Sequence, residues 1–398
     1  MFSRMRPWAI FFSVLLLNGC EQPDAPPLDQ QLYVWQRQWT PAHEIALRDS
    51  RAEFSTLRVL ALQAFPQAGW SRARIDPGLL RRDARPLIAV IRLDGQLKSL
   101  EPTEITAQIL QLLNDWQGQG LTVTGVEIDH DAGNARLPDY RKFLTDLRGA
   151  LPPSLPLSIT ALPAWLGSPE LPALLAAVDS SVLQVHAVSD PRRGLFHVEQ
   201  TKKWVEKWNR VTSKPFYLAL PAYGVALLPQ TMGAPVVESE VTLEQVGERR
   251  ELMADPRQLS ELARDLRDDP PAHLAGLIWF RLPLANDRRA WSLTTLGAVA
   301  RGEALEHRLT IELSAQEGLN DISVINQGNL DGAWPSRVTL AVKNCEGADA
   351  LAGYALQQTP DVLTFTRLSE GRILAGEQRA IGWARCARID QGASNVHP

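Results

Sequence analysis

Eight short apolar runs recur between residues 33 and 282, and longer segments of helical character separate them. The runs are Tyr33–Arg37, Thr56–Gln63, Pro86–Leu93, Val123–Asp129, Leu157–Leu162, Val182–Ala187, Pro215–Leu220 and Leu277–Leu282. Most are almost continuously apolar, as is typical of parallel strands that are covered on both faces. Eight strand–helix units over residues 32–302 predict a (β/α)8 TIM barrel, an α/β fold, rather than an open doubly wound sheet. Such a barrel places its functional groups at the carboxyl ends of the strands.

Three of the intervening segments have apolar residues near the 3.6-residue period of a helix. Pro102–Gln117 shows this period most clearly, and Tyr140–Leu147 and Gln258–Leu266 behave similarly. We therefore expect helices in these segments.

The segment from residue 303 to 398 differs, because its short apolar runs lie between Gly, Asn and Pro turns. The expected strands are Arg308–Leu313, Asp321–Asn326, Arg337–Val342, Val362–Arg367 and Gln378–Ala387. They predict a small antiparallel β-sandwich domain, which either caps the barrel or binds substrate. Cys345 and Cys386 both lie in this segment. In an oxidising compartment we expect them to form a disulfide, and two free buried thiols are the alternative.

The N-terminal residues have the pattern of an export signal. Arg4 and Arg6 precede an apolar run from Trp8 to Leu17. This run has the length of a signal-peptide core and is too short for a spanning helix. We expect residues 1–19 to be a signal peptide.

Leu17-Asn18-Gly19-Cys20 resembles the bacterial lipobox. The resemblance implies cleavage before Cys20, a diacylglycerol on its thiol and an acyl chain such as palmitate on its amine. Several acyl chains anchor a protein firmly, so we expect membrane attachment at Cys20. Glu21 follows the cysteine, which favours the outer membrane, with the protein facing the periplasm or the surface. Residues 20–31, rich in Pro, Gln and Asp, would form the tether, and an ordinary signal peptide with a chance cysteine is the alternative.

Charge and motif content exclude several classes of function. The formal net charge is −4 and there is no run of basic residues, which argues against nucleic-acid binding. No Ser-His-Asp order with a nucleophile elbow and no glycine-rich phosphate loop after a strand occur, and the histidines lack zinc spacing. We expect no nucleic-acid partner, no cofactor and no resident metal.

The stretch Gly125–Asp131 stands at the end of the fourth expected strand. Because a strand repeats every two residues, Glu127, Asp129 and Asp131 share one face, and the apolar residues between them face the other side. Like charges side by side repel, so stability alone does not explain the pattern. Crowded carboxylates can differ in pKa, which provides an acid and a stabilising anion in one site. The stretch therefore predicts an active site.

Two other interpretations of the three carboxylates are open. The first is a buried ionic network, which Glu127 fits best because it is the deepest of the three. The arginines on or just after barrel strands are Arg37, Arg58, Arg92 and Arg281. The second is a divalent cation held with His130 or His186, although His130 should face away from the carboxylates.

Three segments resemble motifs of the family 18 glycoside hydrolases, the chitinases. Gly125–Asp131 resembles their D-x-D-x-E ending on strand four, and Leu218–Gly224 resembles their strand-seven G-x-P-x-Y-G segment. Gly276–Trp279 resembles their strand-eight segment, whose Trp floors a sugar subsite. With the lipobox and the C-terminal β domain, the whole chain also resembles a bacterial lipoprotein family, the domain of unknown function numbered 3142.

The chitinase resemblance implies a polysaccharide or oligosaccharide substrate and assigns roles to residues. It places Asp131 where the catalytic acid sits and Asp129 where a carboxylate positions the acetamido group of the substrate. Glu127 takes the place of the deeper carboxylate that tunes Asp129. Tyr223 would donate a hydrogen bond, and Trp279 would stack on a sugar face.

The chain departs from the chitinase pattern in three places. Its acid is Asp rather than Glu, which is one methylene shorter, and proton transfer tolerates little misplacement. Thr124 and Gly125 precede Glu127, so the outermost Asp of the longer motif is missing. On the sixth strand, Gln184-Val185-His186 lacks the Tyr-Asp pair that holds the acetamido group. These departures favour a different glycan, or binding without cleavage.

Four more residues belong to the candidate binding site. Asp94 follows the third strand, and it is either a turn residue before Gly95 or a rim carboxylate beside the catalytic acid. Trp35 lies near the end of the first strand and suits stacking on a sugar. Gln184 and His186 should point inward on the sixth strand, where the alternative for His186 is a core histidine.

The sequence therefore predicts a lipid-anchored glycoside hydrolase of the cell envelope. In this hypothesis Asp131 protonates the glycosidic oxygen, and Asp129 stabilises the positive charge that develops at the anomeric carbon. The alternative is a barrel that has lost catalysis and binds glycans or organises the envelope. A metal-dependent hydrolase is a third hypothesis.

Overall fold

A computed structural model describes residues 28–186, 194–228, 236–238, 250–285, 287–316, 318–351 and 353–397. The expected signal peptide, Cys20 and most of the expected tether lie outside these ranges.

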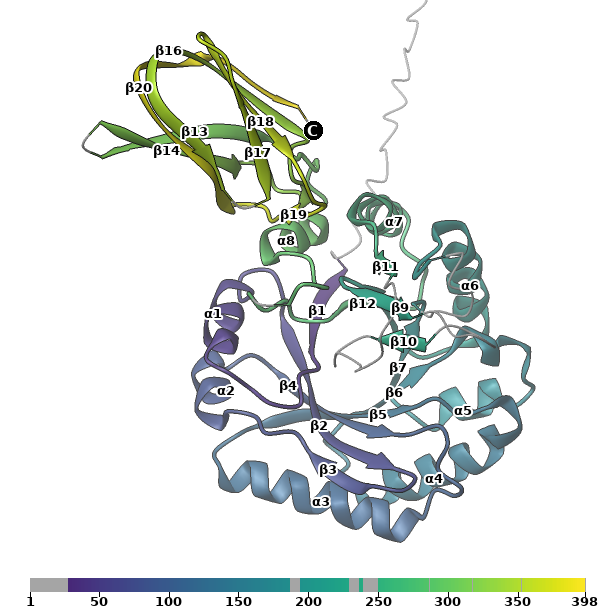
Figure 1. Ribbon diagram of the computed structural model, residues 1–398. Coiled ribbons are helices and arrows are strands. Elements are labelled where there is room, and N and C mark those ends of the chain that lie inside the picture. The colour runs from purple at the N-terminus through teal and green to yellow at the C-terminus, as the bar shows by residue number, and fades with distance from the viewer. Residues whose placement is uncertain are drawn as a thin grey trace, which may run out of the picture.

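Eight parallel strands close into a barrel (Figure 1). They are β1 (Asp29–Val34), β2 (Thr56–Phe65), β4 (Leu87–Leu93), β5 (Val123–His130), β6 (Leu157–Ala161), β7 (Ser180–Gln184), β8 (Phe216–Pro221) and β12 (Leu274–Phe280). Each strand pairs with the next in this order, and β1 pairs with both β2 and β12, which closes the ring. The predicted TIM barrel is confirmed.

Three barrel strands begin two or more residues earlier than the sequence pattern indicated: β1, β12 and also β7, which starts at Ser180 rather than at Val182. β1 starts at Asp29, so the last expected tether residues belong to the barrel. The reason is that Gln31, although polar, is buried inside the barrel, where its Oε1 accepts a hydrogen bond from Arg58 Nε at 2.7 Å. β12 likewise starts at Leu274 and ends at Phe280 rather than at Leu282.

Helices cover the outside of the barrel (Figure 1). They are α1 (Ala42–Asp49), α2 (Pro77–Asp83), α3 (Pro102–Gly118), α4 (Leu137–Ala150), α5 (Leu171–Ala176), α6 (Val198–Val211), α7 (Pro256–Asp268) and α8 (Leu293–Arg301). α3, α4 and α7 lie where the 3.6-residue period predicted helices. Several begin at a proline, whose missing N–H costs nothing in the first turn. In the described ranges, every helix is too short or too polar to cross a membrane.

Each barrel strand has two buried faces, which explains its continuous apolar run. Outward residues such as Val126 and Leu277 pack with the helices in the main core. Inward residues such as Tyr33, Val90 and Ile278 form a second, smaller core inside the barrel. Which face a residue takes therefore decides whether it can reach the mouth of the barrel.

Four shorter strands, β3, β9, β10 and β11, accompany the eight barrel strands. β3 (Gly69–Arg72) forms a hairpin with β2. β9 (Gly224–Leu228) follows β8 directly and pairs with β10 (Val236–Glu238) and β11 (Arg250–Met253) in a separate sheet.

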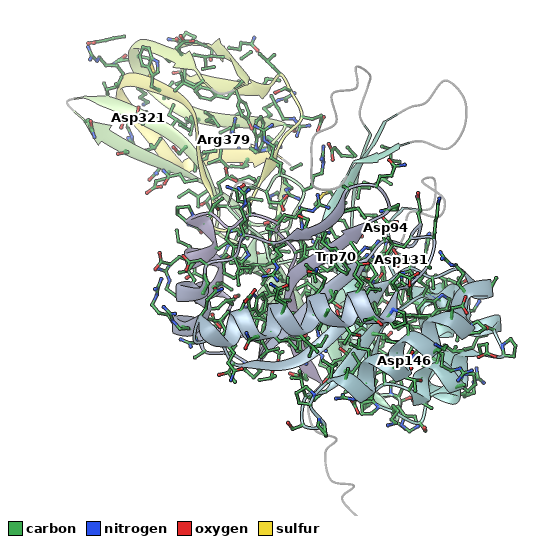
Figure 2. The ribbon with its side chains drawn as sticks, turned by 90° about the horizontal axis from the view of Figure 1, so that it is seen from below. Trp70, Asp94, Asp131, Asp146, Asp321 and Arg379 are labelled. Carbon is green, nitrogen blue, oxygen red and sulfur yellow. A yellow bond between two sulfur atoms is a disulfide. The ribbon has the colours of Figure 1, made fainter. Side chains whose placement is uncertain are left out.

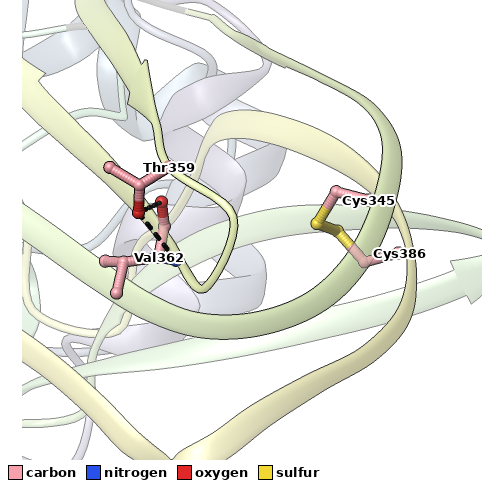
Figure 3. The surroundings of a disulfide bond; sticks show 4 residues. All are labelled: Cys345, Thr359, Val362 and Cys386. Carbon is pink, nitrogen blue, oxygen red and sulfur yellow. Dashed lines mark hydrogen bonds between the residues drawn. A yellow bond between two sulfur atoms is a disulfide. The ribbon is translucent and has the colours of Figure 1, made fainter.

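The C-terminal segment forms an antiparallel β domain, as predicted. Its main sheet runs in the order β13 (Leu309–Gln316), β14 (Leu319–Asn326), β20 (Gln378–His397), β16 (Arg337–Ala350), β18 (Val362–Arg367) and β17 (Tyr354–Gln358). β15 (Gly332–Ala333) and β19 (Arg372–Ile373) form a short ribbon beside it. The predicted disulfide joins Cys345 to Cys386, which face each other on β16 and β20 (Figure 3).

The β domain is fixed to the barrel around the start of α8. The carboxylate of Asp331 accepts hydrogen bonds from the backbone N–H and the hydroxyl of Ser292 at 2.8 and 2.7 Å. Arg372 donates to the carbonyl oxygen of Ala290, in the loop between β12 and α8. These contacts hold the domain beside the barrel.

Candidate functional site

The three carboxylates of the fourth barrel strand lie on one inward face, as the two-residue period predicted. Glu127 and Asp129 are fully buried on β5, and Asp131 follows the strand at the mouth, with 36% of its side chain exposed. Val126 and Ile128 between them belong to the outer core. Alternation along a β-branched strand thus directs the acidic residues inward.

Glu127 lies at the bottom of the site and is sealed by its partners. Tyr33 donates its hydroxyl hydrogen to Glu127 Oε1 at 2.6 Å, and Arg58 forms an ion pair with Oε2. Burial raises the pKa of Glu127, and the charge of Arg58 is the largest effect that opposes this rise. A fully enclosed carboxylate does not contact a ligand, so Glu127 is left with the two roles expected for a deep carboxylate: tuning Asp129, or a purely structural ion pair.

Asp129 is held by donors from three neighbouring strands. Its Oδ1 accepts hydrogen bonds from the Thr160 hydroxyl at 2.6 Å and from Gln184 Nε2 at 3.4 Å. Its Oδ2 pairs with Arg92 Nη1 at 2.7 Å. Gln184 thus points inward as expected, and the sequence pattern missed Thr160.

Arg92 of β4 joins the two aspartates. Its second terminal nitrogen pairs with Asp131 Oδ2 at 2.7 Å, so one guanidinium bridges Asp129 and Asp131. The charge of Asp129 is the largest cause that raises the pKa of Arg92 above its usual value. Arg58 and Arg92 therefore form the ion pairs that the ionic-network interpretation expected.

The other two candidate arginines lie apart from the carboxylates. Arg281 pairs with Asp287 at 2.7 Å. Arg37 donates from Nε to Gln63 Oε1 at 2.8 Å.

An aromatic cluster lines the opposite wall of the mouth. Phe280, at the end of β12, stacks on His186 with ring centres 5.3 Å apart and meets Tyr223 edge-on at 5.3 Å. Trp35 lies 5.1 Å from Phe280, also edge-on. Trp35, His186 and Tyr223, all predicted from the sequence, are thus brought together, with Phe280 at their centre.

Trp279 is not part of this wall, and its predicted stacking role is wrong. It is fully buried in the outer core, where its Nε1 donates to Gln30 Oε1 at 2.8 Å. The adjacent Phe280 takes the inward position. The two-residue period puts Ile278 and Phe280 on one face of the strand and Leu277 and Trp279 on the other. The period alone does not say which face points into the barrel, and the register of β12 decides this.

The side chain of Asp94 stabilises the turn in which this residue lies. Its Oδ1 accepts the backbone N–H of Gln96 at 2.8 Å, as in the turn interpretation. It nevertheless lies close to Asp131 (Figure 2), because Gly95 packs against the Asp131 carbonyl so tightly that a Cβ there would come within 2.5 Å. Asp94 is therefore a turn residue at the rim.

Within the described ranges, no group of three or more His, Cys, Asp or Glu side chains is arranged to bind a metal ion. His130 faces away from the carboxylates, as expected. Its Nδ1 lies 2.9 Å from the carbonyl oxygen of Leu93, and its ring packs against Tyr140.

His186 carries a buried ring nitrogen without a hydrogen-bond partner among the residues that the structure describes. Its Nδ1 lies 3.4 Å from the Tyr223 hydroxyl, whereas its enclosed Nε2 bonds to none of these residues. Burial lowers the pKa of His186 to about 4, against the opposing charge of Asp129. The imidazole is therefore neutral at physiological pH.

This low pKa predicts acid sensitivity. Between the ordinary histidine pKa of 6.5 and about 4, the unfolded chain binds a proton that the folded chain does not, so stability falls as the pH drops through this window. Wild type should lose roughly 2 kcal/mol more than His186→Gln between pH 6.5 and 4.5. Urea unfolding at both pH values measures the difference. Equal losses in the two proteins would show that His186 titrates normally.

Comparisons with solved structures agree with this architecture. A chitinase from Bacteroides thetaiotaomicron is similar over 70% of this chain and 97% of its own, with a TM-score of 0.51 and 10% identity. The spore cortex-lytic enzyme SleL of Bacillus megaterium is similar over 70% of this chain and 75% of its own, with a TM-score of 0.50 and 11% identity. At such identities the likeness concerns the fold. No curated protein matches the chain.

The fold is a (β/α)8 barrel like that of these enzymes, followed by a C-terminal antiparallel β domain. Residues 83–285 match the family described as domain of unknown function (DUF3142), and the chain belongs to that family. Residues 309–387, in the β domain, match a second domain of unknown function (DUF8456).

Proposed function

We propose that this protein binds a polysaccharide at the mouth of the barrel and hydrolyses its glycosidic bonds. The observation that carries the proposal is the charge balance of the network, in which three inward carboxylates face two guanidinium groups. Once Asp131 has given its proton to the leaving group, all three carboxylates are ionised and one negative charge is left over in a largely buried site. A surplus of this sign complements the positive charge that develops on a sugar ring during cleavage.

The two aspartates have different positions and therefore different proposed roles. Asp131 is the proton donor, since it lies at the mouth with part of its carboxylate open to a ligand. Asp129 is buried and fixed by its donors, so its carboxylate stays in place beneath the anomeric carbon. Trp35, Tyr223, His186 and Phe280 form the wall on which the sugar packs.

A second candidate function is glycan binding without cleavage. It is favoured by the ion pair between Arg92 and Asp131, because a general acid must carry a proton whereas an aspartate paired with a guanidinium carries a charge. Hydrolysis requires that this pair opens when substrate binds. A protein in which the pair stays closed would bind glycans and leave them intact.

One experiment separates the two functions. The detergent-solubilised full chain is incubated with a panel of envelope and storage polysaccharides, and binding and new reducing ends are measured on the same samples. Hydrolysis predicts both signals for at least one polymer. Binding without new reducing ends would favour the second function, and the absence of both signals across the panel would contradict the two together.

We also propose that the protein is a lipoprotein anchored through Cys20, in the outer membrane. The support is the lipobox-like Leu17-Asn18-Gly19-Cys20 after an export signal. Cys20→Ala should abolish labelling by radioactive palmitate and move the protein from the membrane to the soluble fraction. Cys345→Ala is the matched control, because that cysteine forms the disulfide. Palmitate labelling that persists in Cys20→Ala would refute the anchor.

A further inference from the structure

Arg37 is an exposed arginine at the rim of the mouth, and two neighbours hold it in place. Its Nε donates to Gln63 Oε1 at 2.8 Å, and its guanidinium carbon lies 5.9 Å from the centre of the Phe65 ring. Gln63 is 4% exposed, so this anchor belongs to the rigid barrel wall. Exposed arginines otherwise keep their rotamer freedom, and fixing one costs side-chain entropy.

The two terminal nitrogens of Arg37 have no protein partner among the described residues, where the hydrogen bond to Gln63 is the single polar contact of the side chain. Two other arginines at this end of the barrel are engaged by carboxylates: Arg92 by Asp129 and Asp131, and Arg281 by Asp287. Asp94, the nearby rim carboxylate, is tied into its own turn. The terminal edge of the Arg37 guanidinium is thus fixed in position and open to a ligand.

Arg37 stands on the same wall as the proposed sugar-binding groups. Tyr33 near the end of β1 is buried, Trp35 after the strand is half-buried, and Arg37 in the following bend is exposed. Gln63, which holds Arg37, is the strand partner of Arg92, and Arg92 is the strand partner of Asp129. Arg37, Gln63, Arg92 and Asp129 therefore form a continuous row of neighbouring residues from the rim to the proposed catalytic carboxylates.

We propose that Arg37 selects an acidic polysaccharide by binding the carboxylate of a uronic acid unit. The planar guanidinium fork matches a carboxylate through two parallel hydrogen bonds, which a neutral sugar alcohol cannot reproduce. The inference rests on the proposed function, since it names the class of glycan that the mouth accepts. The protein carries a formal net charge of −4, so general electrostatic attraction does not favour a polyanion. A preference for acidic polymers must then come from a local site.

The test compares each acidic polymer with its own uncharged form. Alginate, polygalacturonate and hyaluronan are used intact and after reduction of their carboxyl groups to alcohols, and each binds to the full chain in detergent. Wild type should bind at least one intact polymer about tenfold more tightly than its reduced form. Arg37→Gln should lose this difference. Arg48→Gln, which removes the same charge from an exposed arginine in α1, should retain it.

The outcomes distinguish this inference from the proposed function. Equal binding of the intact and reduced forms by wild type overturns the inference and leaves glycan binding standing. A preference that survives in Arg37→Gln also overturns it. Failure to bind every polymer in both forms, and every neutral polysaccharide of the earlier panel, overturns both.

Discussion

Asp131→Asn is expected to lower the rate of glycosidic cleavage by about 10²–10⁴-fold, because the amide cannot donate a proton as the carboxylic acid does. Glycan binding should largely survive, since the side chain keeps its shape and Arg92 keeps its ion pair with Asp129. The measurement is the initial rate of reducing-end formation on the polymer that wild type cleaves, together with the dissociation constant for that polymer.

The matched control for this change is Asp146→Asn. Asp146 lies on α4, where its carboxylate contacts Lys142, far from the mouth in Figure 2. It should retain the wild-type rate. Unchanged turnover in Asp131→Asn would remove the proton-donor role from Asp131, whereas equal losses in both variants would point to a general defect in folding.

Arg58→Met is expected to destabilise the barrel by about 3–5 kcal/mol, because it leaves the carboxylate of Glu127 buried without a compensating charge. Both partners of this pair are almost completely enclosed, at 2% and 0% side-chain exposure. Such a loss is a large part of the stability of an ordinary domain. Urea unfolding, followed by tryptophan fluorescence, measures it.

The double variant Arg58→Met/Glu127→Gln should recover most of this loss. The glutamine is uncharged, and its side-chain oxygen still accepts the hydrogen bond of Tyr33. Arg48→Met, at an exposed arginine, is the control and should leave the unfolding midpoint unchanged. If the double variant is as unstable as Arg58→Met, packing by the arginine side chain rather than its charge holds this part of the core.

The effect of Arg58→Met should also depend on pH. Burial already raises the pKa of Glu127 above its ordinary 4.5, and removing the opposing charge of Arg58 raises it further. Above pH 4.5 the unfolded chain releases a proton that the folded variant keeps, so the stability of the variant falls as the pH rises. The difference from wild type should therefore be smaller at pH 5 than at pH 8.

Much of the fold could be predicted because its signals are local. The continuous apolar runs reflect strands with two buried faces, and the inward Glu127, Asp129 and Asp131 follow from the two-residue period alone. The disulfide between Cys345 and Cys386 was predictable because these cysteines share one domain. Each of these features can be recognised from the positions of residues along the chain, without knowledge of the tertiary contacts.

The partners of the site residues could not be predicted, because they depend on how separate strands align. Trp279 and Phe280 are adjacent in sequence, and the register of β12 against β1 and β8 sends one outward and the other into the mouth. Arg92 was one of four candidate arginines, and the pairing of β4 with β5 selected it for Asp129. Strand register is a property of the closed ring.

The sequence by itself determined that this chain forms a barrel with carboxylates at the end of one strand, since periodicity and burial act residue by residue. The tertiary structure decided which carboxylate is sealed by Arg58, which two share Arg92, and that Arg37 remains open at the rim. The physical reason is that the range of an ion pair is a few ångströms. Groups separated by dozens of residues come within that range only when the ring closes.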